Sequence, residues 1–216
     1  MHIAEGFLPV SHAVGWTVAA VPFVGYGLRR ISRLVSAQPG AALRIGAGGA
    51  FSLLLTSLKL PSVGGSSSHP TGCALGAYLC GPAVMAGLGP MVLMFQALFL
   101  AHGGLTTLGA NAMAMSVVGP WCSWGTWQGL RRLGVPSAAA AGLGAVIGVL
   151  ATYATTAGQL ALAFPDPQAG IGGAFVKFGT VFAWTQLPLS LVEGVTTVIA
   201  LKTLEAQDAP EAEAHG

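Results

Sequence analysis

The chain has 216 residues, of which 7% are charged and 53% hydrophobic; its formal net charge is +2 and its mean hydropathy +0.71. Soluble domains carry about 25% charged residues, so the composition excludes an ordinary soluble domain. The small net charge gives no indication of nucleic-acid binding. Long apolar stretches recur from end to end, which predicts an all-α polytopic membrane protein.

The apolar stretches predict about seven transmembrane helices, because each span needs about 20 residues. We place them at residues 10–28, 45–60, 71–88, 91–108, 112–130, 137–164 and 178–201. A turn is expected at Leu88-Gly89-Pro90 and another at Pro165-Asp166-Pro167. Residues 1–204 are therefore expected to form one transmembrane domain that begins with an external segment, 1–9. Residues 205–216 are expected to be a disordered, acidic, cytoplasmic tail.

The basic residues predict the orientation, since basic residues near span ends stay cytoplasmic. Those that mark cytoplasmic ends are Arg29, Arg30, Arg33, Arg44, Arg131, Arg132 and Lys202. Lys59 and Lys177 fall near predicted external ends, where a long side chain can snorkel. The first apolar run has no basic residue before it and three just after it, whereas a secretory signal has the opposite order. We expect an uncleaved first helix with its amino terminus outside, a cytoplasmic carboxyl terminus, and a multi-pass protein of the cell (inner) membrane.

The first two residues, Met1 and His2, can offer three nitrogen donors to one metal ion. The Met1 amine and the His2 amide close a five-membered chelate ring, and the His2 amide and imidazole close a six-membered one. These short rings hold the three nitrogens nearly coplanar. A tetragonal nitrogen site suits Ni(II) and Cu(II) and accommodates Co(II), whereas Zn(II) prefers a tetrahedron.

Two polar, glycine-rich stretches interrupt the apolar sequence, at residues 61–72 and 102–111. Non-helical backbone at membrane depth is tolerated only where protein or a polar cavity covers it. The predicted topology places both stretches on the side of Met1. His69 is the expected fourth donor, and His102 is expected to orient His69 or its loop, with direct ligation of the metal as the alternative. Hydrogen bonds that fix the loops are expected from Ser66, Ser67, Ser68 and Asn111.

Other reactive residues give no indication of catalysis. Cys73, Cys80 and Cys122 form no CxxC pair, and they are interpreted as packing residues. The sequence contains no HExxH, GxSxG, P-loop or paired-carboxylate motif. Glu193 is the one acidic residue well inside a predicted span, and both a structural hydrogen bond and a contact to a partner stay open. We expect no enzymatic activity.

Three motifs, MHIAEGFLP (1–9), SSSHPTG (66–72) and AHGGLTTLGAN (101–111), closely resemble the CbiM/NikM family. Members of that family are the substrate-specific (S) components of energy-coupling factor transporters for cobalt or nickel. The resemblance covers nearly the whole chain and implies a seven-helix S component. It implies that Met1, His2 and His69 hold the metal. Co²⁺ or Ni²⁺ would then be the transported substrate, with no permanently bound cofactor.

The resemblance also implies partners: a CbiQ-like transmembrane coupling subunit, CbiO-like ATPase subunits and a small CbiN-like membrane protein. The absence of a P-loop fits this assignment, since ATP would be hydrolysed on another chain. Three alternatives stay open. They are a stand-alone metal channel or carrier, an intramembrane metal-dependent enzyme, and an S component for an organic micronutrient. The donor set serves cobalt and nickel alike.

Overall fold

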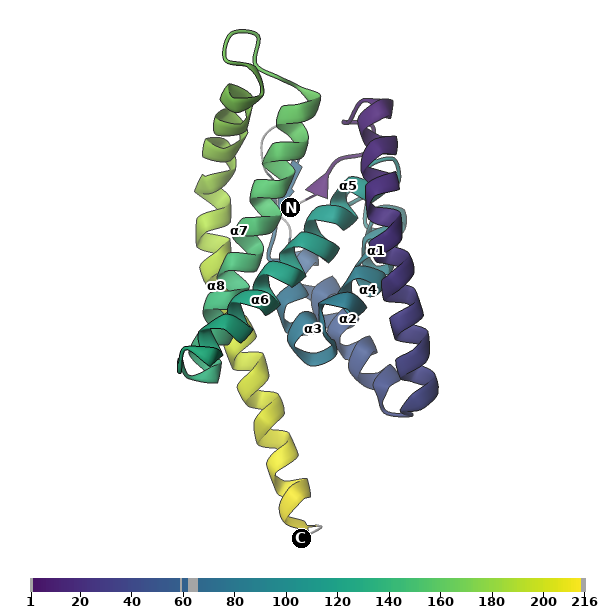
Figure 1. The fold of residues 1–216 in the computed structure, drawn as a ribbon, viewed down its shortest axis with the longest axis vertical. Helices are drawn as coiled ribbons and strands as arrows, with labels where there is room; N and C mark the ends of the chain where they lie inside the picture. The colour runs from purple at the N-terminus through teal and green to yellow at the C-terminus, as the bar shows by residue number, and fades with distance from the viewer. Residues whose placement is uncertain (1, 59, 62–65, 215–216) are drawn as a thin grey trace.

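The computed structural model describes residues 2–58, 60–61 and 66–214, and it is a helical bundle with a small sheet (Figure 1). The predicted all-α class is confirmed. The helices are α1 (Val10–Ala37), α2 (Ala41–Ser57), α3 (Cys73–Cys80), α4 (Pro82–Phe99), α5 (Leu108–Ala112), the π-helix η1 (Met113–Val118), α6 (Gly119–Arg132), α7 (Ser137–Ala163) and α8 (Gly170–Ala214). The strands are β1 (His2–Ile3), β2 (Leu60–Pro61) and β3 (Ser66–Ser68), in the order β1-β3-β2.

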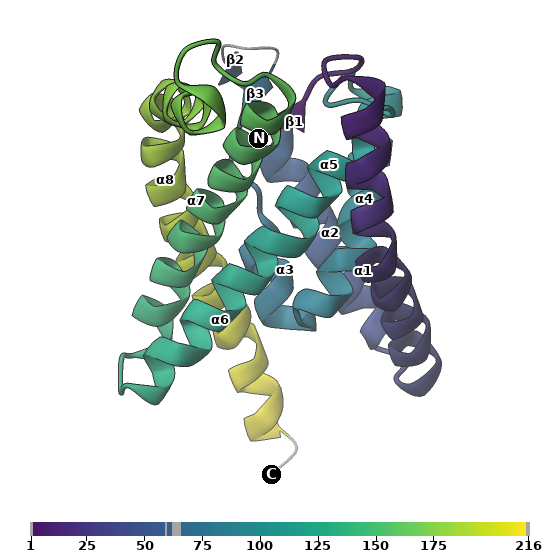
Figure 2. The same ribbon diagram turned by 45° about the horizontal axis from the view of Figure 1, so that its top comes forward.

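The two connections that lie next to arginine-bearing helix ends are at one end of the bundle (Figure 2). The α1–α2 and α6–α7 connections are at the bottom of Figure 2, while the three strands and the α7–α8 connection are at the top. Arg131 and Arg132 end α6 at the lower end. The positive-inside rule would place this end in the cytoplasm and the strands outside, and that orientation stays a prediction.

Three helices in the described part of the chain are long and apolar enough to cross a membrane: α4, α7 and residues 170–206 of α8. Helix α2 is apolar but shorter. Large apolar side chains such as Val10, Trp184 and Leu191 are exposed on the outside of the bundle. A lipid environment would cover them. The structure therefore supports a membrane protein, and the number of seven spans stays a prediction.

The predicted turn at Leu88-Gly89-Pro90 is wrong. The chain breaks at Gly81 instead, where φ is +92°, a backbone conformation that glycine adopts without strain. Pro82 then begins α4, as proline favours the first helical turn, and Gly89 and Pro90 lie inside that helix. Helix α3 is consequently only eight residues long. Transmembrane helices tolerate an internal proline where neighbouring groups take over its hydrogen bond.

Several other boundaries differ from the prediction: for example, α1 runs on to Ala37 rather than residue 28, and α4 ends at Phe99 rather than near residue 108. The non-helical stretch expected at 102–111 ends earlier, because helix resumes at Leu108 and continues through η1 and α6 to Arg132. Helix α8 begins at Gly170 rather than near residue 178. It runs on to Ala214, through the segment expected to be a disordered tail, where alanine and glutamate favour helix. Helix α7 agrees with its predicted span.

Candidate metal centre

The amino-terminal strand is buried inside the bundle. Strand β1 pairs antiparallel with β3, so that His2 lies opposite Ser67 and Ile3 opposite Ser66. The Ile3 side chain is fully buried in an apolar cluster that includes Leu160 of α7 and Phe182 of α8. This burial anchors the residue next to His2, and the pairing brings His2 to the strand that precedes His69.

Asn111 holds the other edge of β1. Its Oδ1 accepts a hydrogen bond from Ile3 N at 2.8 Å, and its Nδ2 donates to Ile3 O at 3.1 Å. The side-chain amide thus pairs with Ile3 as a neighbouring strand would. Thr107 adds a hydrogen bond from its hydroxyl to Ile3 O at 2.8 Å. Asn111 was expected to hold a loop in place by hydrogen bonds. Its hydrogen bonds to Ile3 hold the amino-terminal segment in place.

Glu5 ties the same segment to the loop before α5. Its carboxylate accepts a hydrogen bond from Thr106 N at 3.2 Å. Hydrogen bonds from Thr106 lower the pKa of Glu5, so that the carboxylate stays ionised. Neither Glu5 nor Thr106 was predicted as a site residue, because their contact joins parts of the chain 101 residues apart.

Three buried imidazoles meet beside β1: His2, His69 and His102. Their ligand atoms all lie within 4.8 Å of one another. His2 Nδ1 lies 2.6 Å from His69 Nε2. Adjacent ligands of a square-planar ion, each about 2.0–2.1 Å from the metal, would lie about 2.9 Å apart. The pair of nitrogens therefore has nearly the spacing of two neighbouring metal ligands.

The hydrogen bonding of His69 determines which of its nitrogens is free. His69 Nδ1 lies 2.9 Å from Pro70 O. Because a carbonyl oxygen can only accept, Nδ1 carries the hydrogen and Nε2 presents its lone pair toward His2. Burial lowers the pKa of His2 and of His69, which keeps both rings neutral, and metal ligation requires the neutral imidazole.

His102 joins the cluster from the loop between α4 and α5. Its ring centroid lies 4.2 Å from that of His2 and 4.9 Å from that of His69. The next residue, Gly103, has φ +78°, and a Cβ there would lie 3.0 Å from His2 Cδ2. Glycine at this position allows the loop to pack against the His2 ring.

The loop that carries His69 is held by Glu193 of α8. Thr71 donates to both carboxylate oxygens of Glu193, from its backbone N and, at 2.7 Å, from its hydroxyl. Ser68 shares a hydrogen bond of 2.8 Å with Thr185. The buried acid is therefore a structural hydrogen-bonding group. A lone acidic residue in an apolar helix was the signal that indicated its importance.

Three predicted residues are less completely described. Met1, whose amine is the first expected donor, lies outside the described residues. Ser66 and Ser67 pair with β1 through their backbones, and their side chains are likewise outside the description. The structure thus brings together His2, His69, His102, Ser68 and Asn111 from the predicted set.

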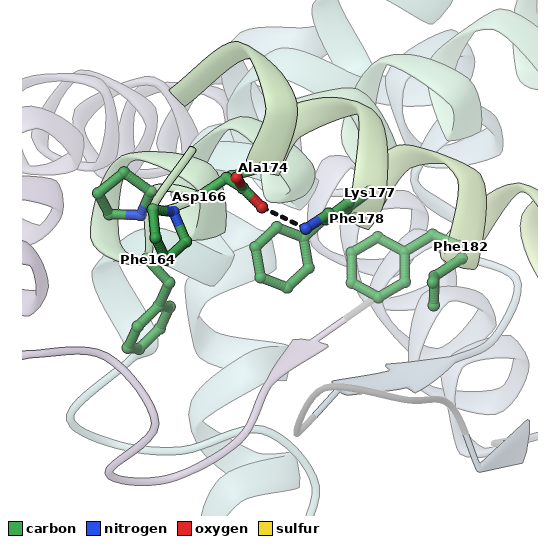
Figure 3. Close-up of a pocket in the computed structure, with 9 residues that line it drawn as sticks. Phe164, Asp166, Ala174, Lys177, Phe178 and Phe182 are labelled. Atoms are coloured by element: carbon green, nitrogen blue, oxygen red, sulfur yellow. Dashed lines mark hydrogen bonds and ion pairs between the residues drawn. The ribbon is translucent and has the colours of Figure 1, made fainter. Parts of the chain in front are cut away.

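A separate pocket of about 330 Å³ lies at the α7–α8 connection (Figure 3). Phe164, Phe178 and Phe182 line it, and an ion pair between Lys177 and Asp166 crosses it. The hydrogen bond from Lys177 lowers the pKa of Asp166 to about 2. Its lining is mainly apolar, so this pocket is chemically unlike the imidazole cluster.

Comparison with known proteins identifies the family. Residues 2–211 match the CbiM family, described as "Cobalt uptake substrate-specific transmembrane region". The chain is 55% identical over 204 residues to a cobalt transport protein CbiM of Streptomyces coelicolor, covering 94% of this chain and 88% of the relative. It is 49% identical over 216 residues to a cobalt transport protein CbiM of a Roseiflexus species, covering 100% of this chain and 86% of the relative.

Two solved structures share the fold. One is a truncated transition-metal transporter, with a TM-score of 0.82 and 26% identity, matched over 96% of this chain and 99% of that one. The other is a transition-metal transporter, with a TM-score of 0.84 and 25% identity, matched over 97% and 94%. The chain therefore belongs to the CbiM family, and it is a membrane protein of transition-metal transport.

Proposed function

We propose that this chain captures Co²⁺ or Ni²⁺ on the external side of the cell (inner) membrane and delivers the ion inward, as the substrate-specific subunit of an ATP-driven energy-coupling factor transporter. The observation that carries the proposal is the buried pair of ring nitrogens, His2 Nδ1 and His69 Nε2, 2.6 Å apart. Family membership and the neighbouring His102 support it. The chain has no proposed catalytic role.

The proposed donors are the Met1 amine, the His2 amide nitrogen, His2 Nδ1 and His69 Nε2. Nδ1 is the ring nitrogen that closes a six-membered chelate with the amide of its own residue. It is also the nitrogen that faces His69. Four nitrogens with three held coplanar favour a square-planar ion, which fits Ni(II) and accommodates Co(II). The ion is the transported substrate, and no cofactor is permanently bound.

Transport requires partners in this proposal. A CbiQ-like coupling subunit, CbiO-like ATPases and a CbiN-like membrane protein would supply ATP-driven movement, since the sequence has no nucleotide-binding motif. The single transmembrane domain would extend over residues 1–204, with segment 1–9 external. An organic micronutrient is the weaker alternative, because nitrogens this closely spaced suit an ion rather than an organic molecule.

An amino-terminal extension tests the proposal. One glycine placed before Met1 moves the amine out of chelating reach, and it should abolish uptake of labelled nickel or cobalt by cells that contain the complete transporter. The matched control is a tag at the carboxyl terminus, which should leave uptake intact. Full uptake by the extended chain would contradict the proposed donor set.

A further inference from the structure

One turn of α8 lies beside the neighbours of both ligand histidines. The Phe182 side chain is fully buried in the same apolar cluster as Ile3, which follows the first of these histidines. Three residues further along the helix, the Thr185 hydroxyl shares a hydrogen bond of 2.8 Å with the Ser68 hydroxyl. Ser68 is fully buried and directly precedes His69.

The direction of this hydrogen bond follows from the second contact of Thr185. The Thr185 hydroxyl donates to Phe182 O at 3.1 Å, because a backbone carbonyl can only accept. A hydroxyl has one hydrogen, so the Thr185 oxygen accepts the hydrogen of Ser68. Removal of the Thr185 hydroxyl would therefore take this acceptor away from a buried donor.

A second attachment to α8 lies on the other side of His69. Thr71 donates to both carboxylate oxygens of Glu193, from its backbone N and from its hydroxyl. Thr185 and Glu193 are separated by about 12 Å along the helix, at 1.5 Å per residue. The chain from Ser68 to Thr71 can extend over about 10 Å, so this segment runs alongside α8. His69 thus lies between two attachments to one helix.

We propose that Thr185 is a positioning residue, which holds Ser68 against α8 and so fixes where His69 presents its ring to the metal. The inference rests on the proposed function and deepens it. A segment that is already ordered loses less conformational entropy when it binds an ion, and its affinity is correspondingly higher. Thr185 acts through the loop rather than on the ion.

Thr185 allows a cleaner test than Glu193. Glu193 is fully buried and accepts two hydrogen bonds, so its replacement would disturb the fold as well as the loop. Thr185 is only partly buried. Thr185→Val keeps the β-branched shape of threonine and removes the hydroxyl.

The test is a double-mutant cycle of Ser68→Ala and Thr185→Val in the purified protein with its native amino terminus, titrated with Ni(II). Thr185→Val should weaken nickel binding roughly 10-fold, the effect of leaving one buried donor without its acceptor. Ser68→Ala should weaken binding too. The double variant should bind no more weakly than the weaker single variant, because both changes remove the same hydrogen bond. Thr185→Ser keeps the hydroxyl and should bind nickel like the parent.

Thr180→Val is the matched control on the same helix. The exposed Thr180 hydroxyl donates to Val176 O at 2.8 Å, within α8. This variant should match the parent in nickel affinity, and thermal unfolding should show that both valine variants fold alike. The visible band of bound nickel should change in Thr185→Val and not in Thr180→Val, since a displaced His69 alters the ligand field.

Three results would overturn the inference alone: parent-like affinity in Thr185→Val, an equal loss in Thr180→Val, or losses that add in the double variant. A parent that binds no nickel would sink the proposed function as well.

Discussion

At the scale of single residues, the metal centre depends on side chains that hydrogen-bond the backbone close to the ligand histidines. Asn111 hydrogen-bonds both polar groups of Ile3, and Glu193 accepts twice from Thr71. Each of these contacts is made to a residue one or two positions away from a ligand histidine. A short amino-terminal segment has little intrinsic order of its own, so these contacts determine where His2 lies.

Asn111→Ala should leave Ile3 N without an acceptor and remove one of two hydrogen bonds to Ile3 O. Leaving a buried donor unsatisfied costs about 1–3 kcal/mol, so nickel affinity should fall by roughly 10-fold or more. Titration of the purified variant measures the change. Thr155→Ala is the control, since among the described residues Thr155 bonds only within its own helix, to Ala151 O. Equal nickel affinity in the Asn111 variant and the parent would show that Asn111 does not position His2.

The sequence pointed to the residues whose chemistry is unusual for their position. His2, His69, His102 and Asn111 stand in polar motifs within apolar sequence, and the structure gathers them beside β1. Thr107 was missed although it stands in the same polar stretch, because its hydrogen bond to Ile3 O joins parts of the chain 104 residues apart.

At the scale of elements, helix boundaries were predicted less well than helices. The Gly89-Pro90 pair indicates a turn in soluble proteins, yet it lies inside α4. The actual break, at Gly81-Pro82, carries the same dipeptide, so the Gly-Pro signal alone does not distinguish the two positions. Proline has no N–H, so one backbone carbonyl of the preceding helical turn loses its donor. In an apolar bundle an internal proline is tolerated where neighbouring groups supply another donor for that carbonyl.

Close contact between α1 and α4 depends on glycine at one position. A Cβ on Gly27 would lie 2.3 Å from Gly87 N, whereas a Cβ on Gly25 would meet nothing within 4 Å. Gly27→Ala should therefore push the helices apart and destabilise the fold by about 1–3 kcal/mol. Gly25→Ala, on the same helix, should be neutral or slightly stabilising, since alanine favours helix.

Thermal unfolding in detergent distinguishes the two glycine variants. The unfolding midpoint of Gly27→Ala should be lower than that of the parent, and the midpoint of Gly25→Ala should not. Equal midpoints for the two variants would show that α1 and α4 do not pack as closely as the structure has them. The pair of variants differs only in the position of one methyl group, so the general effect of alanine cancels.

At the scale of the whole molecule, the bundle separates two ends with different chemistry. The connections next to the arginine-bearing helix ends lie at one end, and the strands lie toward the other (Figure 2). Composition was sufficient to predict an all-α membrane protein, and motif resemblance was sufficient to predict the family. Neither could place the hydrogen bonds of Thr185 or Glu193, which follow from packing.

The most direct measurement is the metal content and visible absorption of the purified protein with a native amino terminus, loaded with Ni(II), beside the His69→Ala variant. The account predicts one equivalent of nickel with the yellow band of a square-planar nitrogen site, lost in the variant, because His69 Nε2 supplies the fourth donor. No binding by the parent, or the same band in both proteins, would contradict the proposed centre.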